Sequence, residues 1–224
     1  MELPRIQYIT HPDEQFDDLS WVHRLHEGGV KWIQLRMKEE DVIRRFPDKH
    51  YLAFFHDTAD RMRAITSALG MLLTVNDLEE VAIFSHADGL HVGQEDELPS
   101  EGKRSGFIIG GTVSSFEEVL RYDPSQLAYF GAGPLRHTET KRKLKPVLGE
   151  EGYHTLLSRM RTAGFRQPVF AIGGVVPEDI APLFDLGVYG VAVSGAIFNA
   201  DHAIGVVRSF TTKTENYEHV ENRG

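Results

Sequence analysis

The sequence predicts a single (β/α)8 TIM barrel, and three observations support this fold class. Short runs rich in β-branched and aromatic residues alternate with longer stretches of helical periodicity, which is typical of βαβ units and a parallel sheet. Eight such runs are present, and 224 residues fall within the range of about 200–400 residues of these barrels. No Gly-x-Gly-x-x-Gly sequence follows the first strand, which disfavours an open dinucleotide-binding sheet.

In the first half of the chain, turn and cap residues separate the expected elements. Gly28 and Gly29 end the first helix, and Asn76 or Asp77 is placed to cap the third. The second helix is marked by apolar residues at helical spacing, namely Leu52, Phe55, Ala59 and Met62. The expected elements are 6–10 (strand), 19–27 (helix), 32–37 (strand), 51–69 (helix), 71–75 (strand), 78–84 (helix) and 90–92 (strand).

The second half continues the alternation around one long loop at 131–149. A Ser-Ser-Phe-Glu-Glu sequence opens a helix with Ser114 or Ser115 as its cap, and Pro177 and Gly187 bracket a later helix. The other expected elements are 107–111 (strand), 127–130 (strand), 152–163 (helix), 169–172 (strand), 177–186 (helix), 190–193 (strand) and 201–210 (helix). We expect residues 1–210 to form the catalytic barrel and residues 211–224 a polar tail, helical or frayed.

Charge and composition exclude several classes of function. A net charge of −9 and a pI of about 5.6 disfavour nucleic acid and anionic membranes as partners. The absence of cysteine excludes disulfides, thiolate metal sites and cysteine nucleophiles. Residues 1–10 resemble no targeting signal and no apolar run could span a membrane, so a cytoplasmic protein is expected. A homo-oligomer is left open.

Three polar residues alternate along the second strand. Gln34, Arg36 and Lys38 share one face with a period of two, where the interior of a barrel should be apolar. A solvated or salt-bridged face would explain this stripe without any function. Because Arg and Lys bind phosphate oxygens, the stripe also predicts a phosphate cradle.

Acidic residues follow the next two strands. Asp77 comes after the third strand and Asp96 after the fourth. Each could be an ordinary cap or turn residue, but a pair on adjacent strand ends suits Mg²⁺, which takes one or two carboxylates, waters and phosphate oxygens. The pair therefore predicts a magnesium site at the mouth of the barrel.

Two further segments predict contacts with phosphate. Thr138, Thr140 and Lys141 stand in the long loop, where they could close on phosphate. Gly173-Gly174 and Ser194 follow the seventh and eighth strands, the usual phosphate site of such barrels, although tight-turn glycines are the simpler explanation.

Several catalytic signatures are absent. The sequence contains no Gly-x-Ser-x-Gly elbow, no His-Glu-x-x-His and no Walker A motif. The 11 histidines show no zinc-ligand spacing, and His91, inside a strand, is expected to be a core or lining residue.

Eight short motifs, taken in order, resemble those of the thiamin phosphate synthase family and cover the chain from about Ile6 to Phe198. The motifs are Ile33-Gln-Leu-Arg-Met-Lys38, Val75-Asn-Asp77, Ala87-Asp-Gly-Leu-His-Val-Gly-Gln-Glu-Asp96, Ile109-Gly-Gly-Thr112, Gly131-Ala-Gly-Pro134, Thr138-Glu-Thr-Lys141, Ala171-Ile-Gly-Gly174 and Gly190-Val-Ala-Val-Ser194. The resemblance implies that a pyrimidine pyrophosphate loses its pyrophosphate through a carbocation-like state, which a thiazole phosphate captures to give thiamin phosphate.

The resemblance also implies roles for individual residues. Catalytic roles on the pyrophosphate fall to Arg36, Lys38 and Lys141, and Mg²⁺ is expected on Asp77 and Asp96. Substrate-binding roles fall to Gln34, Leu35, Met37, Asn76, Thr112, Thr138, Glu139, Thr140, Gly174, Val193 and Ser194.

The chain departs from the family pattern at two positions. Thr112 stands where many members have a serine, and Ser114 where many have a histidine. Threonine keeps the hydroxyl but adds a methyl group, so these departures put the shape of the pyrimidine pocket in doubt.

Three competing functions also fit a barrel that binds phosphate. A thiazole tautomerase relative would characteristically lack the Gln-x-Arg-x-Lys, Asn-Asp and Gly-Gln-x-Asp residues that are intact here. A non-catalytic barrel would bind thiazole phosphate without turnover. An unrelated phosphate-binding isomerase would need a base facing a substrate carbonyl.

Overall fold

The protein is a closed barrel of eight parallel strands, as predicted. The computed structural model describes residues 2–93, 96, 98, 106–137 and 146–221. Each strand pairs with the next, and β8 pairs with β1 to close the ring. The strands are β1 (Ile6–Ile9), β2 (Trp32–Leu35), β3 (Leu72–Asn76), β4 (Gly89–Val92), β5 (Ile108–Val113), β6 (Tyr129–Ala132), β7 (Val169–Ile172) and β8 (Gly190–Val193).

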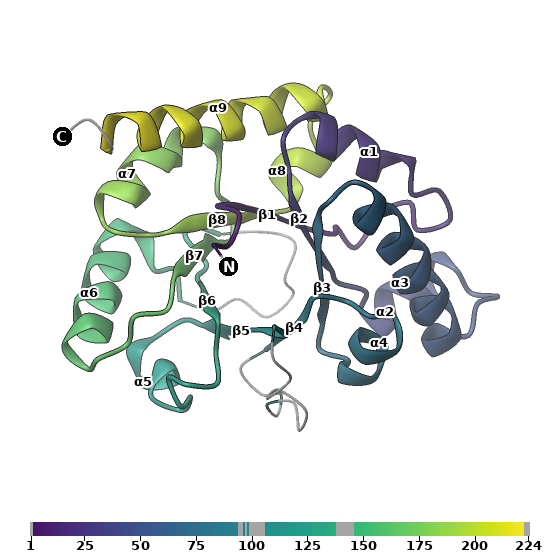
Figure 1. Ribbon diagram of the computed structural model, residues 1–224, viewed down its shortest axis with the longest axis horizontal. Coiled ribbons are helices and arrows are strands. Elements are labelled where there is room, and N and C mark those ends of the chain that lie inside the picture. Colours follow the sequence, from purple (N-terminus) through teal and green to yellow (C-terminus); the bar gives the residue numbers. More distant parts are fainter. Residues whose placement is uncertain (1, 94–95, 97, 99–105, 138–145, 222–224) are drawn as a thin grey trace.

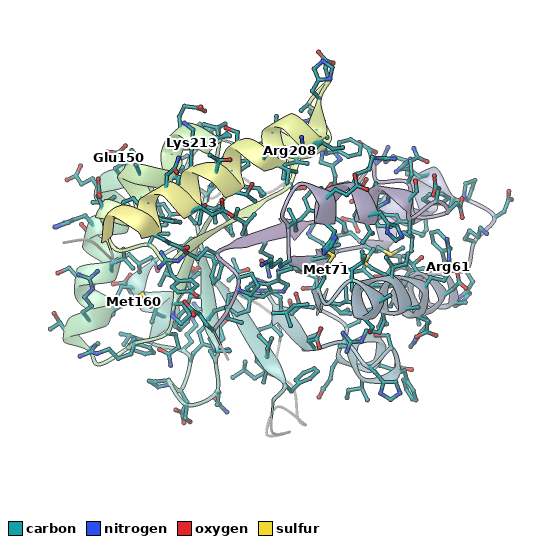
Figure 2. The ribbon with its side chains drawn as sticks, turned by 45° about the horizontal axis from the view of Figure 1, so that its top comes forward. Arg61, Met71, Glu150, Met160, Arg208 and Lys213 are labelled. Carbon is teal, nitrogen blue, oxygen red and sulfur yellow. The ribbon has the colours of Figure 1, made fainter. Side chains whose placement is uncertain are left out.

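Helices surround the ring of strands (Figure 1). They are α1 (Ser20–Glu27), α2 (Glu39–Arg45), α3 (Tyr51–Ala68), α4 (Glu79–Phe84), α5 (Phe116–Val119), α6 (Gly149–Thr162), α7 (Ile180–Asp185), α8 (Gly195–Phe198) and α9 (Ala203–Glu221), with a 3-10 turn, η1 (Pro177–Asp179), before α7. Charged side chains such as Arg61, Glu150 and Lys213 lie at the periphery on these helices (Figure 2). None of the helices in the described part of the chain is long and apolar enough to cross a membrane.

The sequence did not predict α2 and α8. Helix α2 buries only Val42, so it lacks the apolar periodicity that marks a helix; its acidic first turn and basic last turn complement the helix dipole instead. Helix α8 has only four residues, too few to show a period. Strand β6 begins two residues later than expected, and α9 runs without interruption through residues 211–221.

The two faces of each strand serve two separate hydrophobic clusters. The larger cluster lies between the barrel and its helices and includes Ile33 and Leu35 of β2. The smaller one includes Trp32, Tyr129 and Phe170, which come from β2, β6 and β7. Because β2 and β6 are not neighbours in the sheet, the contact of 4.9 Å between the Trp32 and Tyr129 ring centres crosses the barrel interior.

A glycine on β5 makes this interior packing possible. A Cβ atom on Gly110 would lie 2.1 Å from Cζ of Tyr129, which is shorter than any real contact. Glycine therefore allows the Tyr129 ring to lie fully buried across the barrel. With Leu3, Ile108 and Phe170, this ring helps to fill the end of the barrel where the strands begin.

Candidate functional site

Strand β2 directs its polar residues to the mouth of the barrel, the end where the strands finish. Gln34 faces the interior, where its amide donates to Gln7 (3.3 Å). Leu35 and Met37 have the opposite parity and are buried in the larger core cluster, so the predicted alternation is confirmed. Their contact with a substrate stays a prediction.

The two predicted acidic residues lie close together. A Cβ atom on Gly93 would be 2.7 Å from Asp96 Oδ2 and 4.0 Å from Asp77 Oδ1, and the Gly93 amide donates to Asp96 (2.8 Å). Lys38 forms an ion pair with Asp77. Burial raises the pKa of Asp77, the Lys38 ammonium acts against this shift, and the neighbouring Asp96 carboxyl adds to it.

The capping role considered for Asn76 or Asp77 is wrong. Helix α4 begins at Glu79 with Leu78 as its cap, and no side chain caps it. Asp77 has a φ of +67°, its amide donates to the His91 carbonyl of β4 (2.9 Å), and its carboxylate binds Lys38 instead of capping the helix. By contrast, Ser115 caps α5, as predicted, by accepting a hydrogen bond from the Glu118 amide (3.3 Å).

The donor set fits a magnesium ion that is shared with a substrate. Among the described residues, no group of three or more His, Cys, Asp or Glu side chains could hold a metal by itself. Mg²⁺ needs no such cage, because it keeps waters and usually takes one or two carboxylates together with phosphate oxygens. Asp77 and Asp96, with two cationic side chains beside them, match that pattern.

Arg36 brings a largely buried positive charge to the same place. Burial lowers the pKa of its guanidinium, and the carboxylates of Asp77 and Asp41 act against this shift. Within the described chain its guanidinium forms no ion pair, in contrast to Lys38. A buried cation without a direct counterion is well suited to hold an anionic ligand.

The structure brings two further predicted residues to the same mouth. Asn76 ends β3 and is paired in register with His91 of β4. Thr112, on β5, is buried and its Oγ1 lies 2.7 Å from Nε2 of His91, which is itself a buried interior residue, as expected.

The ends of β7 and β8 form the opposite side of the mouth. Gly173 and Gly174 have φ values of +84° and +72°, and a Cβ on Gly174 would lie 2.4 Å from Cγ of Arg136. Backbone geometry and packing thus already require these glycines. Val193 is buried at the end of β8, and the buried Oγ of Ser194, just before α8, has no hydrogen-bond partner in the described structure.

Arg136 was not predicted from the sequence to belong to the site. Its guanidinium donates to the Gly174 carbonyl (2.5 Å) and forms a two-pronged ion pair with Asp179 (2.6 and 2.7 Å). It therefore ties the loop after β6 to the turn after β7. A lone arginine between a leucine and a histidine gave no spacing from which this contact could have been predicted.

Four of the predicted residues, Thr138, Glu139, Thr140 and Lys141, lie outside the described residues, and their roles stay predictions.

Comparison with known proteins identifies the family. The model of a family described as thiamine monophosphate synthase matches residues 6–197. A thiamine-phosphate synthase of Bacteroides fragilis is 40% identical over 198 residues, covering 87% of this chain and 92% of that protein, and one of Bacteroides thetaiotaomicron is 38% identical over 200 residues, covering 88% and 90%. A solved thiamine phosphate pyrophosphorylase of Pyrococcus furiosus superposes with a TM-score of 0.74 at 25% identity, covering 95% of this chain and 96% of that one. This chain belongs to the thiamine monophosphate synthase family, whose members are transferases of thiamine biosynthesis.

Proposed function

We propose that this enzyme joins 4-amino-2-methyl-5-hydroxymethylpyrimidine pyrophosphate to 4-methyl-5-(2-hydroxyethyl)thiazole phosphate. The bond between the pyrimidine methylene carbon and oxygen breaks first, and pyrophosphate leaves with the electron pair. The thiazole nitrogen then donates its lone pair to the methylene cation, giving thiamin phosphate. Membership of a transferase family supports the overall reaction, and the residues at the mouth support the details below.

The observation that carries the proposal is the cluster of opposite charges at the ends of β2, β3 and β4. Arg36 and Lys38 supply two cations, and Asp77 and Asp96 supply two carboxylates within reach of the same place. A departing pyrophosphate gains negative charge as its bond breaks, so fixed cations beside it stabilise the transition state more than the ground state. A carboxylate pair would otherwise repel such an anion.

A magnesium ion held by Asp77 and Asp96 would remove that repulsion and neutralise charge on the leaving oxygens. Lys38 contacts Asp77, so its ammonium would lie beside a pyrophosphate bound there. Lys141 would close on the same pyrophosphate from the loop.

The thiazole phosphate would bind across the mouth. The unpartnered Ser194 hydroxyl and the backbone near Gly174 and Val193 are available to it, with the Thr138 and Thr140 hydroxyls from the loop. Two separate anion sites suit an enzyme that joins two phosphorylated substrates. We expect the reaction to take place in the cytoplasm.

Purified protein mixed with both substrates and Mg²⁺ tests the proposal. We expect thiamin phosphate and pyrophosphate to appear in equal amounts, and a chelator such as EDTA to stop both. A folded protein that binds thiazole phosphate without turnover would favour the non-catalytic barrel. Conversion of a thiazole phosphate isomer without coupling would favour the tautomerase.

A further inference from the structure

A continuous path of hydrogen bonds crosses the interior of the barrel just below its mouth. Five polar side chains form it, in the order Gln34, Gln7, Tyr129, His91 and Thr112. Gln34 Nε2 donates to Gln7 Oε1 (3.3 Å), and Gln7 Nε2 donates to the Tyr129 hydroxyl (3.2 Å). His91 continues the path, with Nδ1 2.8 Å from the Tyr129 oxygen and Nε2 2.7 Å from Thr112 Oγ1. None of the five is more than 8% exposed, so each group depends on its neighbours rather than on water.

The two ends of this path are predicted substrate contacts. The family resemblance assigns substrate-binding roles to Gln34 and Thr112, on the pyrimidine side of the reaction, and they lie on β2 and β5, which are not adjacent in the barrel. Gln7, Tyr129 and His91 have no role in the proposed function. They are nevertheless the groups that join one substrate contact to the other.

The hydrogen-bond donors decide the direction of the path. Burial raises the pKa of the Tyr129 hydroxyl, and side-chain hydrogen bonds from Gln7, Gln34 and Thr74 act against this shift. Gln7 Nε2 donates to the Tyr129 oxygen (3.2 Å), so the proton of the hydroxyl itself needs an acceptor. Nδ1 of His91, at 2.8 Å, is that acceptor when it carries no proton.

The tautomer of His91 follows from this direction. A neutral imidazole with an unprotonated Nδ1 carries its proton on Nε2, which then donates to Thr112 Oγ1. Since Thr112 accepts there, its own hydroxyl proton is available to another acceptor. At the other end, Gln34 Nε2 donates to Gln7 and also interacts with the Tyr129 hydroxyl, which fixes the orientation of the amide and leaves its carbonyl oxygen for a ligand.

The path is also rigid. The Tyr129 ring is held by edge contacts to Trp32 (4.9 Å between ring centres) and Phe170 (5.4 Å). Gly110 leaves the space into which the ring fits. A hydroxyl held in one position fixes which atoms of its neighbours, Gln7 and His91, act as donor and as acceptor.

We propose that Gln7, Tyr129 and His91 are positioning residues that orient Gln34 and Thr112 to recognise the aminopyrimidine ring. This inference rests on the proposed function. An aminopyrimidine presents ring-nitrogen acceptors beside an amino donor. The oriented carbonyl oxygen of Gln34 offers an acceptor for the amino group, and the Thr112 hydroxyl offers a donor for a ring nitrogen. Loss of the Tyr129 hydroxyl would allow the Gln34 amide and the Thr112 hydroxyl to adopt other orientations, although both residues would still be present.

Tyr129→Phe tests the proposal, and Tyr153→Phe is the matched control. Tyr153 is equally buried, and its hydroxyl also makes a hydrogen bond, to the Ala132 carbonyl, but outside this path. We expect Tyr129→Phe to raise the KM for the pyrimidine pyrophosphate about tenfold, the worth of one hydrogen bond of roughly 1–1.5 kcal/mol, and to leave the KM for thiazole phosphate within about twofold. Tyr153→Phe should lower the melting temperature similarly and change neither KM. If Tyr129→Phe does not fold, Gln7→Met breaks the same path one link earlier.

A second readout does not depend on activity. Nitrogen-15 NMR of the ring of His91 should show the Nε2–H tautomer in the wild type and a mixture in Tyr129→Phe, with no change in Tyr153→Phe. If the wild type forms no thiamin phosphate, the proposed function fails, and the tautomer still tests the path. The positioning role is overturned if His91 keeps one tautomer in Tyr129→Phe, or if an active Tyr129→Phe shows the same two KM values as Tyr153→Phe.

Discussion

Replacement of Asp77 by asparagine should separate function from stability. The substitution keeps the shape of the side chain and removes its charge from the proposed metal site. Asparagine also tolerates the φ of +67° at this position, which is unfavourable for most other residues. Asp77→Asn therefore tests the carboxylate charge with little disturbance of the backbone.

The expected change in stability is small and can be positive. Burial raises the pKa of Asp77 above its ordinary value of 3.8, which means that the folded state disfavours the charged carboxylate. Each pKa unit corresponds to about 1.4 kcal/mol at neutral pH, and removal of the charge recovers this. The raised pKa already includes the opposing ion pair with the partly exposed Lys38, which by itself contributes about 0–1 kcal/mol. At neutral pH the variant should therefore be at least as stable as the wild type.

The expected change in activity is large. One unit charge at about 4 Å contributes about 4 kcal/mol at an effective dielectric constant of about 20, and water recovers part of it. We expect kcat to fall about 100-fold, equivalent to roughly 2.7 kcal/mol of transition-state stabilisation. The Mg²⁺ concentration for half-maximal activity should rise.

Kinetics and thermal unfolding together check this prediction. Mg²⁺ with pyrophosphate should raise the melting temperature of the wild type and leave that of Asp77→Asn unchanged, because a ligand stabilises only the protein that binds it. As pH rises from 3.8 through the raised pKa, the contribution of Asp77 to wild-type stability should fall, because the folded state loses a proton that it holds more tightly than the unfolded state. Asp77→Asn should lack this decrease. Wild-type kcat and Mg²⁺ dependence in the variant would refute the metal assignment.

Three further predictions concern stability and the second anion site. Glu14 is buried, and burial raises the pKa of its carboxyl. Glu14→Gln should therefore be at least as stable as the wild type at pH 7, and it should lack the loss of stability that ionisation of Glu14 causes as pH rises above 4.5. Urea unfolding at several pH values measures both effects. Gly110→Ala places a methyl group against the Tyr129 ring and should reduce the free energy of unfolding by about 1–3 kcal/mol. The control, Gly205→Ala, lies in a helix where the nearest side-chain atom is 3.8 Å from the new Cβ, and it should increase the free energy of unfolding by about 0.5–1 kcal/mol. Equal effects of the two substitutions would contradict the packing described. Ser194→Ala removes a buried hydroxyl that has no partner in the described structure. The melting temperature should therefore stay the same or rise, while the KM for thiazole phosphate should increase. A lower melting temperature with an unchanged KM would indicate a structural role.

Local patterns in the chain were enough to predict the eight strands, their parallel order and the alternation along β2. Each depends on neighbours in sequence: a strand exposes alternate residues on opposite faces, and Gly28 and Gly29 end a helix wherever the rest of the chain lies. Helix α2 could not be predicted from such local patterns. It buries a single residue and so carries no apolar period.

The sequence by itself determined which residues face the barrel interior, and only the tertiary structure decided which of them meet. The charge cluster could be anticipated, because parallel strands end at the same edge and bring Asp77 and Asp96 together. The contact between Arg136 and Asp179 and the path through Tyr129 could not be. The first depends on how the loop after β6 packs on the turn after β7. The second depends on closure of the barrel, which brings non-adjacent strands face to face, and on the absence of a Cβ at Gly110, where the Tyr129 ring lies.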